Sequence, residues 1–125
     1  MSAWIHRTGE LMGLPDALGS EFDLCANEAV TNIIRYAYED SASHRISVRI
    51  RRALDHVDLE VEDDGRPFNP LEFPPAALAS SLEQAPLEGR GIQLIRGLMA
   101  ECRYQRRDGK NILTMVSRSR APVGQ

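Results

Sequence analysis

The 125-residue sequence predicts an α+β fold, a two-layer sandwich with helices on one face of a mixed, largely antiparallel sheet. Three observations favour it. Residues 20–38 carry apolar side chains three and four positions apart, as an amphipathic helix does. Segments 45–62 and 102–117 each contain two alternating apolar runs, which are typical of hairpins. A second helical run, 92–99, separates them, so the order is helix, hairpin, helix, hairpin.

The main helix is preceded by a candidate N-cap, Ser20, and by a possible shorter helix over residues 3–12. Glu21 and Asp23 near the amino end of the main helix suit the positive end of its dipole. The segment before it ends at Gly13, where the helical pattern stops. We therefore expect the longer helix to begin at about Ser20 and to end near Tyr38.

The first hairpin has a predicted register. If residues 53–56 connect its strands, Ile50 faces Leu59 and Val48 faces Val61 on the apolar side. On the polar side the same register places Arg51 beside Asp58 and Arg49 beside Glu60, which predicts cross-strand ion pairs rather than a basic patch.

Five of the seven prolines lie between Arg66 and Glu88, a density that no regular element tolerates for long. A loop of that length in a compact domain is usually a lid or a binding loop. Regular structure is expected again at Gly89-Arg90-Gly91, followed by a helix. The last hairpin turns at Asp108-Gly109, a strong hairpin-turn signal.

The composition excludes several classes of function. With 42% hydrophobic and 26% charged residues the chain resembles an average globular domain, and we expect a single domain over residues 1–125. A net charge of −3 does not provide the basic surface that binding to a polyanion such as a nucleic acid needs. The sequence has no run of the roughly 18 to 20 apolar residues that a bilayer span needs and no signal core, so a cytoplasmic protein is expected.

The cysteines and histidines offer little chemistry. Cys25 and Cys102 form no CxxC pair, which argues against a disulfide framework or a zinc knuckle, and we expect both to be buried thiols. Three scattered histidines give no metal cluster and no Ser-His-Asp arrangement.

The main helix carries the first candidate site. Glu28 and Asn32, four residues apart, share one flank, where a carboxylate and a carboxamide can combine a general base with a ligand for Mg²⁺. Arg35 lies on the same side and could meet phosphate. Taken alone, Glu28 and Asn32 are better explained as solvated polar residues of a helix flank, and Arg35 as a surface ion pair with Glu28 or Glu39.

Two further motifs carry glycine. Asp63-Asp64-Gly65 ends a strand, so the first carboxylate could lie at the mouth of the fold and the glycine could permit a sharp turn or a close approach. The alternative is a simple turn. Gly89-Arg90-Gly91 before a helix could cradle phosphate with backbone N–H groups, although a lone GxG is weakly specific.

Read together, the features run ExxxN on a helix, a hairpin, DxG, a long loop, and GxG at a second helix. This order resembles the Bergerat-fold ATPases, the GHKL or histidine-kinase-like superfamily. The run Glu28-Ala29-Val30-Thr31-Asn32, continuing to Tyr38, is most similar to the anti-sigma factor serine kinase branch. The resemblance covers about residues 21–117.

The resemblance implies ATP and Mg²⁺ as cofactors and assigns roles to the corresponding residues. Glu28 corresponds to the general base, Asn32 to the Mg²⁺ ligand and Arg35 to a basic residue near the phosphates. Asp63 corresponds to the carboxylate that accepts from the adenine amino group. The remaining assignments are Gly65 as the close-approach glycine, 66–88 as the ATP lid, and Gly89 and Gly91 as phosphate-loop glycines.

The chain departs from the family pattern at three places. Only about twenty residues precede the main helix, where the family usually has a strand and a fuller first helix. Asn111 stands where the family often carries a threonine near the nucleotide. Leu87 stands where some members carry an arginine directed at the phosphates, and Arg90 is the candidate to replace it.

The function that the resemblance implies is an anti-sigma factor with ATP-dependent serine kinase activity toward an anti-sigma-factor antagonist, in a bacterial partner-switching system. Its partners would be that antagonist and a sigma factor or comparable target, with a homodimer left open. One alternative is a nucleotide-gated protein-binding module without kinase activity. Another, a detached histidine-kinase catalytic domain, is disfavoured by the run 28–32.

Overall fold

A computed structural model describes residues 1–38, 44–72 and 87–117, and for 87–90 it describes the backbone alone. Most of the predicted lid, residues 73–86, therefore lies outside the described residues. The elements, in chain order, are α1 (Ser2–Leu11), α2 (Asp16–Tyr36), β1 (Ile46–Arg52), β2 (Val57–Asp63), a short 3-10 helix η1 (Pro70–Glu72), α3 (Leu87–Leu98), β3 (Met99–Arg107) and β4 (Lys110–Ser117).

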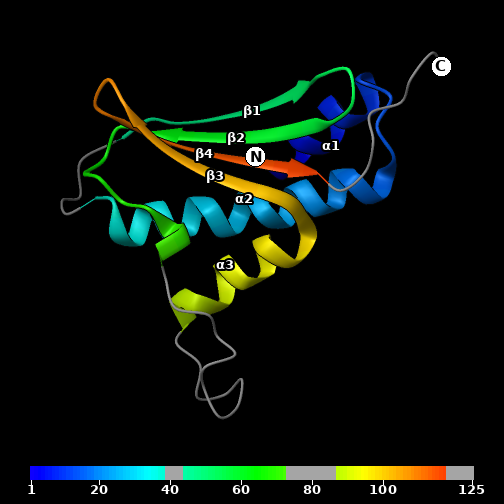
Figure 1. Cartoon of the computed structure of the whole chain (residues 1–125). Helices are drawn as coiled ribbons and strands as arrows, with labels where there is room; N and C mark the ends of the chain where they lie inside the picture. The colour runs from blue at the N-terminus through cyan, green and yellow to red at the C-terminus, as the bar shows by residue number, and fades with distance from the viewer. Residues whose placement is uncertain (39–43, 73–86, 118–125) are drawn as a thin grey trace, which may run out of the picture.

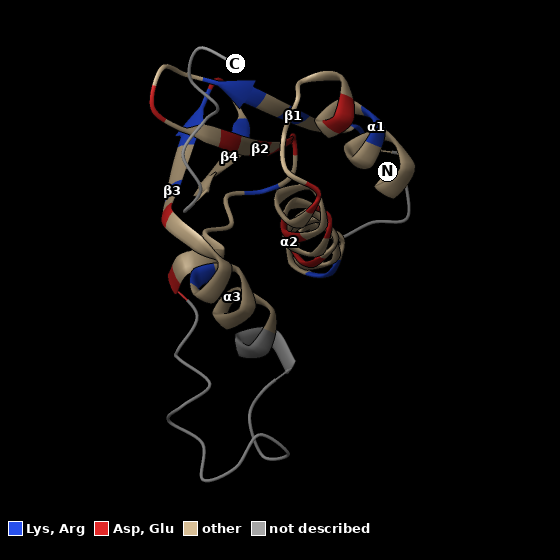
Figure 2. Ribbon diagram, turned by 90° about the vertical axis from the view of Figure 1, so that its right-hand side faces the viewer, with Lys and Arg blue, Asp and Glu red and all other residues tan. Residues whose placement is uncertain are grey.

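The predicted two-layer α+β architecture is confirmed. The four described strands form one sheet in the order β1-β2-β4-β3, and α2 and α3 cover one of its faces (Figure 1). Seen from the side, α1 lies beside α2 near β1, and α3 lies under β3 (Figure 2). Every neighbouring pair of these strands is antiparallel, so the parallel component of the expected mixed sheet is absent from the described residues.

The core fills the space between sheet and helices. Alternate residues of β2 point into it, because successive side chains of a strand lie on opposite faces. The largest fully buried side chains come from every layer of the fold: Phe22, Ile5, Leu18, Leu59, Ile92, Ile95, Met99 and Met115. Asp63, the last residue of β2, shares the inward face of that strand and so points toward the helices.

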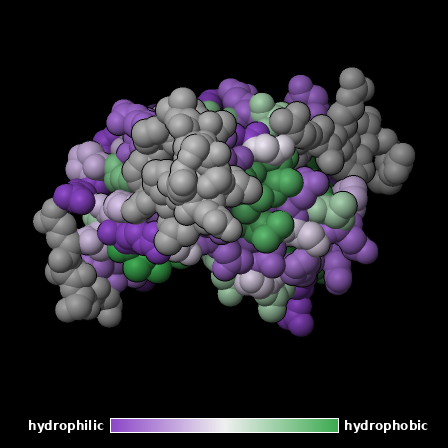
Figure 3. Space-filling view, turned by 90° about the horizontal axis from the view of Figure 1, so that it is seen from below, coloured by the Kyte–Doolittle hydropathy of each residue, from purple (hydrophilic) through white to green (hydrophobic). Residues whose placement is uncertain are grey.

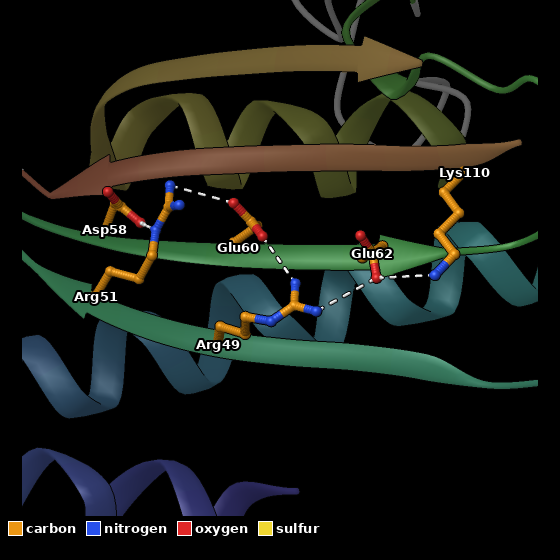
Figure 4. A network of polar contacts seen from close by, with 6 residues as sticks. All are labelled: Arg49, Arg51, Asp58, Glu60, Glu62 and Lys110. Atoms are coloured by element: carbon orange, nitrogen blue, oxygen red, sulfur yellow. Dashed lines mark hydrogen bonds and ion pairs between the residues drawn. The ribbon is translucent and has the colours of Figure 1, made fainter. Parts of the chain in front are cut away.

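The first hairpin has the predicted register. Ile50 pairs with Leu59 and Val48 with Val61. The polar face carries the predicted ion pairs, and each arginine also contacts a second carboxylate, which joins both strands and Lys110 in one network (Figure 4). The distances are 2.8 Å for Arg49–Glu60, 3.4 Å for Arg49–Glu62, 3.0 Å for Arg51–Asp58, 3.1 Å for Arg51–Glu60 and 3.7 Å for Lys110–Glu62.

The start of α2 differs from the prediction. The helix begins at Asp16, directly after Pro15, and Ser20 lies inside it rather than capping it. Leu18 is buried, and a Cβ on Gly19 would lie 3.5 Å from the imidazole of His6 in α1. The helix therefore begins a turn earlier than predicted, through the good helix formers Ala17 and Leu18 and through Gly19, whose weak propensity is offset by packing against α1.

The second hairpin turns as predicted. Asp108 and Gly109 both adopt positive φ angles, 55° and 77°. Two successive residues in this conformation make the tight turn whose twist suits antiparallel strands. The turn places Asn111, the second residue of β4, opposite Asp63 in β2 and Arg106 in β3.

The helical side of the molecule exposes some apolar area. Seen from below, hydrophobic atoms reach a mainly hydrophilic surface in places (Figure 3). The exposed large apolar side chains of α2 and α3 are Leu24, Ile34 and Leu94. None of the helices in the described ranges has the length and apolar character that crossing a membrane requires.

Candidate active site between α2, α3 and the end of β2

Glu28 and Asn32 face α3 at Gly91. A Cβ built on Gly91 would lie 2.6 Å from Glu28 Oε2 and 3.7 Å from Asn32 Nδ2. Any larger side chain at this position would therefore push the carboxylate away. The structure brings together three residues predicted from two separate motifs, and it leaves the Glu28 carboxylate half-buried against the second turn of α3.

Asn32 is a buried polar residue whose amide is not fully satisfied. Its side chain is only 4% exposed, and Nδ2 has no hydrogen-bond partner among the described residues. A buried amide without a partner costs free energy, about 1–3 kcal/mol, unless a ligand satisfies it. An asparagine amide presents its oxygen instead when it turns by 180°, and a carboxamide oxygen is a normal ligand of Mg²⁺. This orphaned group, beside the Glu28 carboxylate and the glycine of α3 that leaves room for it, fits a metal-nucleotide site.

Asp63 forms the second part of the site. It is 2% exposed, and its Oδ1 accepts hydrogen bonds from the Gly65 N–H at 2.9 Å and from Asn111 Nδ2 at 3.0 Å. Within the described ranges, no hydrogen bond reaches its Oδ2. A buried carboxylate that keeps one oxygen for an incoming donor is suited to selecting an amino group.

Gly65 makes its close approach to a helix. A Cβ at this position would lie 2.5 Å from the Ala37 carbonyl oxygen and 2.8 Å from the Ala37 Cβ, and the next N–H, of Arg66, donates to that carbonyl at 2.9 Å. Gly65 does not have a positive φ, so the predicted sharp turn is not what requires glycine. Its absence of a side chain lets the end of β2 lie directly against the end of α2.

That contact also fixes the spacing of the site. Ala37 lies five residues beyond Asn32, which corresponds to about 7.5 Å along a helix axis. The carboxylate of Asp63 and the Glu28–Asn32 pair therefore lie at successive levels of α2, on the side that faces the sheet and α3.

The glycine motif lies in a different context from the one predicted. Helix α3 begins at Leu87, so Gly89 falls in its first turn and Gly91 in its second, not before the helix. The helix thus starts two residues before the position predicted, even though glycine disfavours helix interiors by about 1 kcal/mol relative to alanine. The N–H groups without intrahelical partners belong to the turn that starts at Leu87 and includes Gly89. The Arg90 side chain lies outside the described part of the chain.

Comparison with known proteins identifies the family. A family described as "Histidine kinase-like ATPase domain" matches residues 1–117 of the chain. The chain belongs to this family. The predicted resemblance to the histidine-kinase-like ATPases is thereby confirmed, and with it the α+β architecture.

Two of its relatives are named as kinases. The serine/threonine-protein kinase BtrW of Bordetella bronchiseptica is 38% identical over 96 residues, which cover 77% of this chain and 68% of that protein. The serine-protein kinase RsbW of Bacillus subtilis is 25% identical over 112 residues, covering 82% and 70%. These relatives favour the serine kinase branch over the histidine kinases.

A solved structure supports the fold. The histidine kinase domain from the Erythrobacter litoralis EL346 blue-light activated histidine kinase superimposes with a TM-score of 0.58 at 20% sequence identity. The alignment covers 93% of this chain and 63% of that chain. At this identity the likeness establishes the shared fold alone.

The Arg35 side chain lies beside Tyr36 and makes no described contact with Glu28 or Asn32 of this ATPase domain. The side chain is exposed, and its guanidinium carbon lies 5.9 Å from the centre of the Tyr36 ring. The ring of Tyr36 in turn stacks on Phe68, with centroids 5.4 Å apart. No described ion pair joins Arg35 to Glu28, so the predicted contact with phosphate stays a prediction.

The histidine-kinase-like ATPase site of this chain also contains a polar cluster that the sequence did not reveal. Asn111, noted only for standing where a threonine is common, accepts hydrogen bonds from Tyr104 and Arg106 of β3 and donates to Asp63. Alternation along the last hairpin could have placed all three of these residues on the inward face. It could not have revealed which of them touch.

The second aspartate of DxG has its own partner. The Tyr38 hydroxyl donates to Asp64 Oδ1 at 2.9 Å. This hydrogen bond is the main reason that the pKa of Asp64 lies below its ordinary value, whereas burial and the same carboxylate raise the pKa of Tyr38 to about 12. Asp64 is thus tied to the end of α2 and points away from the buried position of Asp63.

The thiols offer no alternative nucleophile. Burial raises the pKa of Cys25 to about 12 and also raises the pKa of Cys102, so both are protonated at neutral pH. Cys25 is buried as expected, whereas Cys102 is only partly buried. Among the described residues, no group of three or more histidine, cysteine or acidic side chains could hold a metal ion.

Proposed function

We propose that the chain is a Mg-ATP-dependent protein serine kinase that phosphorylates a small anti-sigma-factor antagonist and otherwise binds a sigma factor or comparable target. The single observation that carries the proposal is the Glu28 carboxylate, one helical turn from the unsatisfied amide of Asn32 and opposite Gly91. The kinase relatives and the run 28–32 support the same activity.

Each residue has a defined part in this proposal. Glu28 accepts the proton of the substrate serine hydroxyl as its oxygen bonds to the terminal phosphorus of ATP, while the bond from that phosphorus to the bridging oxygen breaks and ADP leaves. Asn32 holds Mg²⁺, which supplies neutralisation of the phosphate charge. Asp63 accepts a hydrogen bond from the adenine amino group through Oδ2, and the free N–H groups at the start of α3 lie toward the phosphates.

Other parts of the proposal rest on the family resemblance. We propose that residues 66–88 form the ATP lid of a single domain, that Gly65 and Arg90 line the nucleotide site, and that the protein works in the cytoplasm. A homodimer is an option within the same proposal. Arg35, on the exposed side of α2, is assigned to the phosphates or to the protein substrate.

The experiment separates binding from transfer. Nucleotide affinity is measured by calorimetry, and transfer is measured with radiolabelled ATP and a small single-domain anti-sigma-factor antagonist as the substrate. Glu28→Gln keeps the shape of the side chain but cannot take a proton, so transfer should fall by about a hundredfold or more while Mg-ATP affinity stays within about threefold. Glu21→Gln, two turns earlier on α2, is the matched control and should transfer normally.

Two results would contradict the proposal. Transfer by Glu28→Gln at the wild-type rate would reduce Glu28 to a helix-flank carboxylate. Tight ATP binding by the wild type without transfer to the antagonist would favour the nucleotide-gated binding module instead.

A further inference from the structure

Asn111 occupies a buried position beside the proposed adenine carboxylate. It is 4% exposed and pairs with Asp63 across β2 and β4. A buried carboxamide needs partners for both of its ends, because each unsatisfied group costs free energy. The hydrogen-bond partners of Asn111 lie in three separate segments: β2, the chain that follows β2, and β3.

The nitrogen of Asn111 bridges two segments. Nδ2 donates to Asp63 Oδ1 at 3.0 Å and to the carbonyl oxygen of Arg66 at 2.8 Å. Both donor hydrogens of the amide are therefore used. One of them holds the carboxylate at the end of β2, and the other holds the backbone three residues further along the chain.

The oxygen of Asn111 receives the remaining bonds. Oδ1 accepts from the Phe68 N–H at 3.2 Å, from Arg106 Nη1 at 3.2 Å and from the hydroxyl of Tyr104. Arg106 Nη1 also donates to the Gly65 carbonyl at 2.7 Å. Neither a hydroxyl nor a carboxylate could donate twice and accept in this way, so the site is built around a carboxamide.

This arrangement has two consequences. The donors from Gly65 and Asn111 both reach Oδ1 of Asp63, which fixes the rotation of the carboxylate and leaves Oδ2 without a hydrogen bond from the described residues. The same amide pins the backbone of residues 66–68, the first residues after DxG.

The geometry points to Asn111 as a positioning residue that sets adenine selectivity through Asp63 and anchors the chain that leaves β2. The selectivity half rests on the proposed function, since it requires Asp63 to meet the adenine amino group. The anchoring half does not, because it depends only on contacts within the chain.

The test compares three folded proteins: Asn111→Ala, Asn111→Asp and, as control, Gln105→Ala on the exposed face of β3. The first readout is the affinity for ADP relative to purine riboside diphosphate, which lacks only the 6-amino group. The second is the hydrogen-exchange rate of the Phe68 amide, measured by NMR without nucleotide.

The two variants should separate the two halves. Asn111→Ala should lower the preference for the 6-amino group about tenfold and speed Phe68 exchange, since it removes both ends of the amide. Asn111→Asp keeps oxygen acceptors for Phe68 but loses the donors and places a second carboxylate beside Asp63. It should lose the preference and keep the Phe68 amide protected. Gln105→Ala should change neither quantity.

Several results would overturn the inference. An unchanged 6-amino preference in Asn111→Ala rules out the selectivity half, and an unchanged Phe68 exchange rate rules out the anchoring half. If Asn111→Ala does not fold, the 6-amino preference of Asn111→Asp decides the selectivity half, and faster Phe68 exchange in Asn111→Asp contradicts the anchoring half. A wild type that binds no ADP refutes the proposed function, together with the selectivity half, and leaves the exchange rates to judge the anchor.

Discussion

Replacing Gly91 with alanine should make the protein more stable and less active. Gly91 lies within α3, where alanine is favoured over glycine by about 1 kcal/mol. The new methyl group would lie 2.6 Å from Glu28 Oε2, and an ordinary contact begins near 3.4 Å. The carboxylate must therefore retreat by about 0.8 Å, which a flexible side chain does at little cost.

The displacement matters for chemistry more than for folding. A misplacement of about 1 Å in a reacting geometry can cost roughly a hundredfold in rate. We expect Gly91→Ala to keep or raise the melting temperature, by up to about 4 °C, and to lower phosphoryl transfer by one to two orders of magnitude, that is, about 10- to 100-fold. Melting is followed by circular dichroism and transfer by radiolabelled ATP.

Gly97→Ala is the matched control. Gly97 lies in the same helix, and a Cβ there would have nothing within 4 Å. It should gain stability without loss of transfer. In the double variant Gly91→Ala with Glu28→Ala, the new methyl group no longer meets a carboxylate. The free energy of unfolding that Gly91→Ala adds to Glu28→Ala should therefore equal the gain from Gly97→Ala in the wild type. Wild-type transfer by Gly91→Ala would refute the placement of Glu28 against α3.

Three further predictions concern single side chains. Asp63→Asn should weaken ADP binding at least about tenfold in calorimetry, because a hydrogen bond to a charged acceptor contributes about 1.5–3 kcal/mol. The control Asp64→Asn changes the exposed neighbouring aspartate and should leave ADP affinity unchanged. Asn32→Ala should abolish the difference between ADP affinities measured with Mg²⁺ and with a chelator; a persisting difference would exclude Asn32 as the metal ligand. Cys25, with its pKa raised from 9.0 to about 12, stays protonated as the pH rises through 9, so iodoacetamide should not label it in the folded protein at pH 9; rapid labelling there would contradict its burial.

Local signals predicted the parts of the fold that depend on local chemistry. The register of the first hairpin followed from alternation plus charge, since only one register pairs Arg51 with Asp58 and Ile50 with Leu59 at once. The turn at Asp108-Gly109 followed from residues that tolerate positive φ. Both are properties of neighbouring residues, so one sequence suffices to show them.

Tertiary packing decided what the sequence did not reveal. Helix α2 starts a turn earlier than predicted, through Gly19 beside His6 of α1, and α3 includes three glycines, which local propensity disfavours. In the site, spacing predicted that Glu28 and Asn32 share a flank, but the residue opposite them, Gly91, became known only when α3 was in place. The partners of Asn111 span three segments, which no local pattern encodes.

The strand order has a consequence for the solubility of the sheet. In the described part of the chain, β1 and β3 are the outermost strands, and each carries three arginines: Arg49, Arg51 and Arg52 on the first, Arg103, Arg106 and Arg107 on the second. An outermost strand presents unpaired backbone groups to which another strand can add, and positive charge on it opposes that addition. Two copies meeting edge to edge would bring six arginines together. The arginines on both outermost strands therefore oppose the edge-to-edge pairing of two copies.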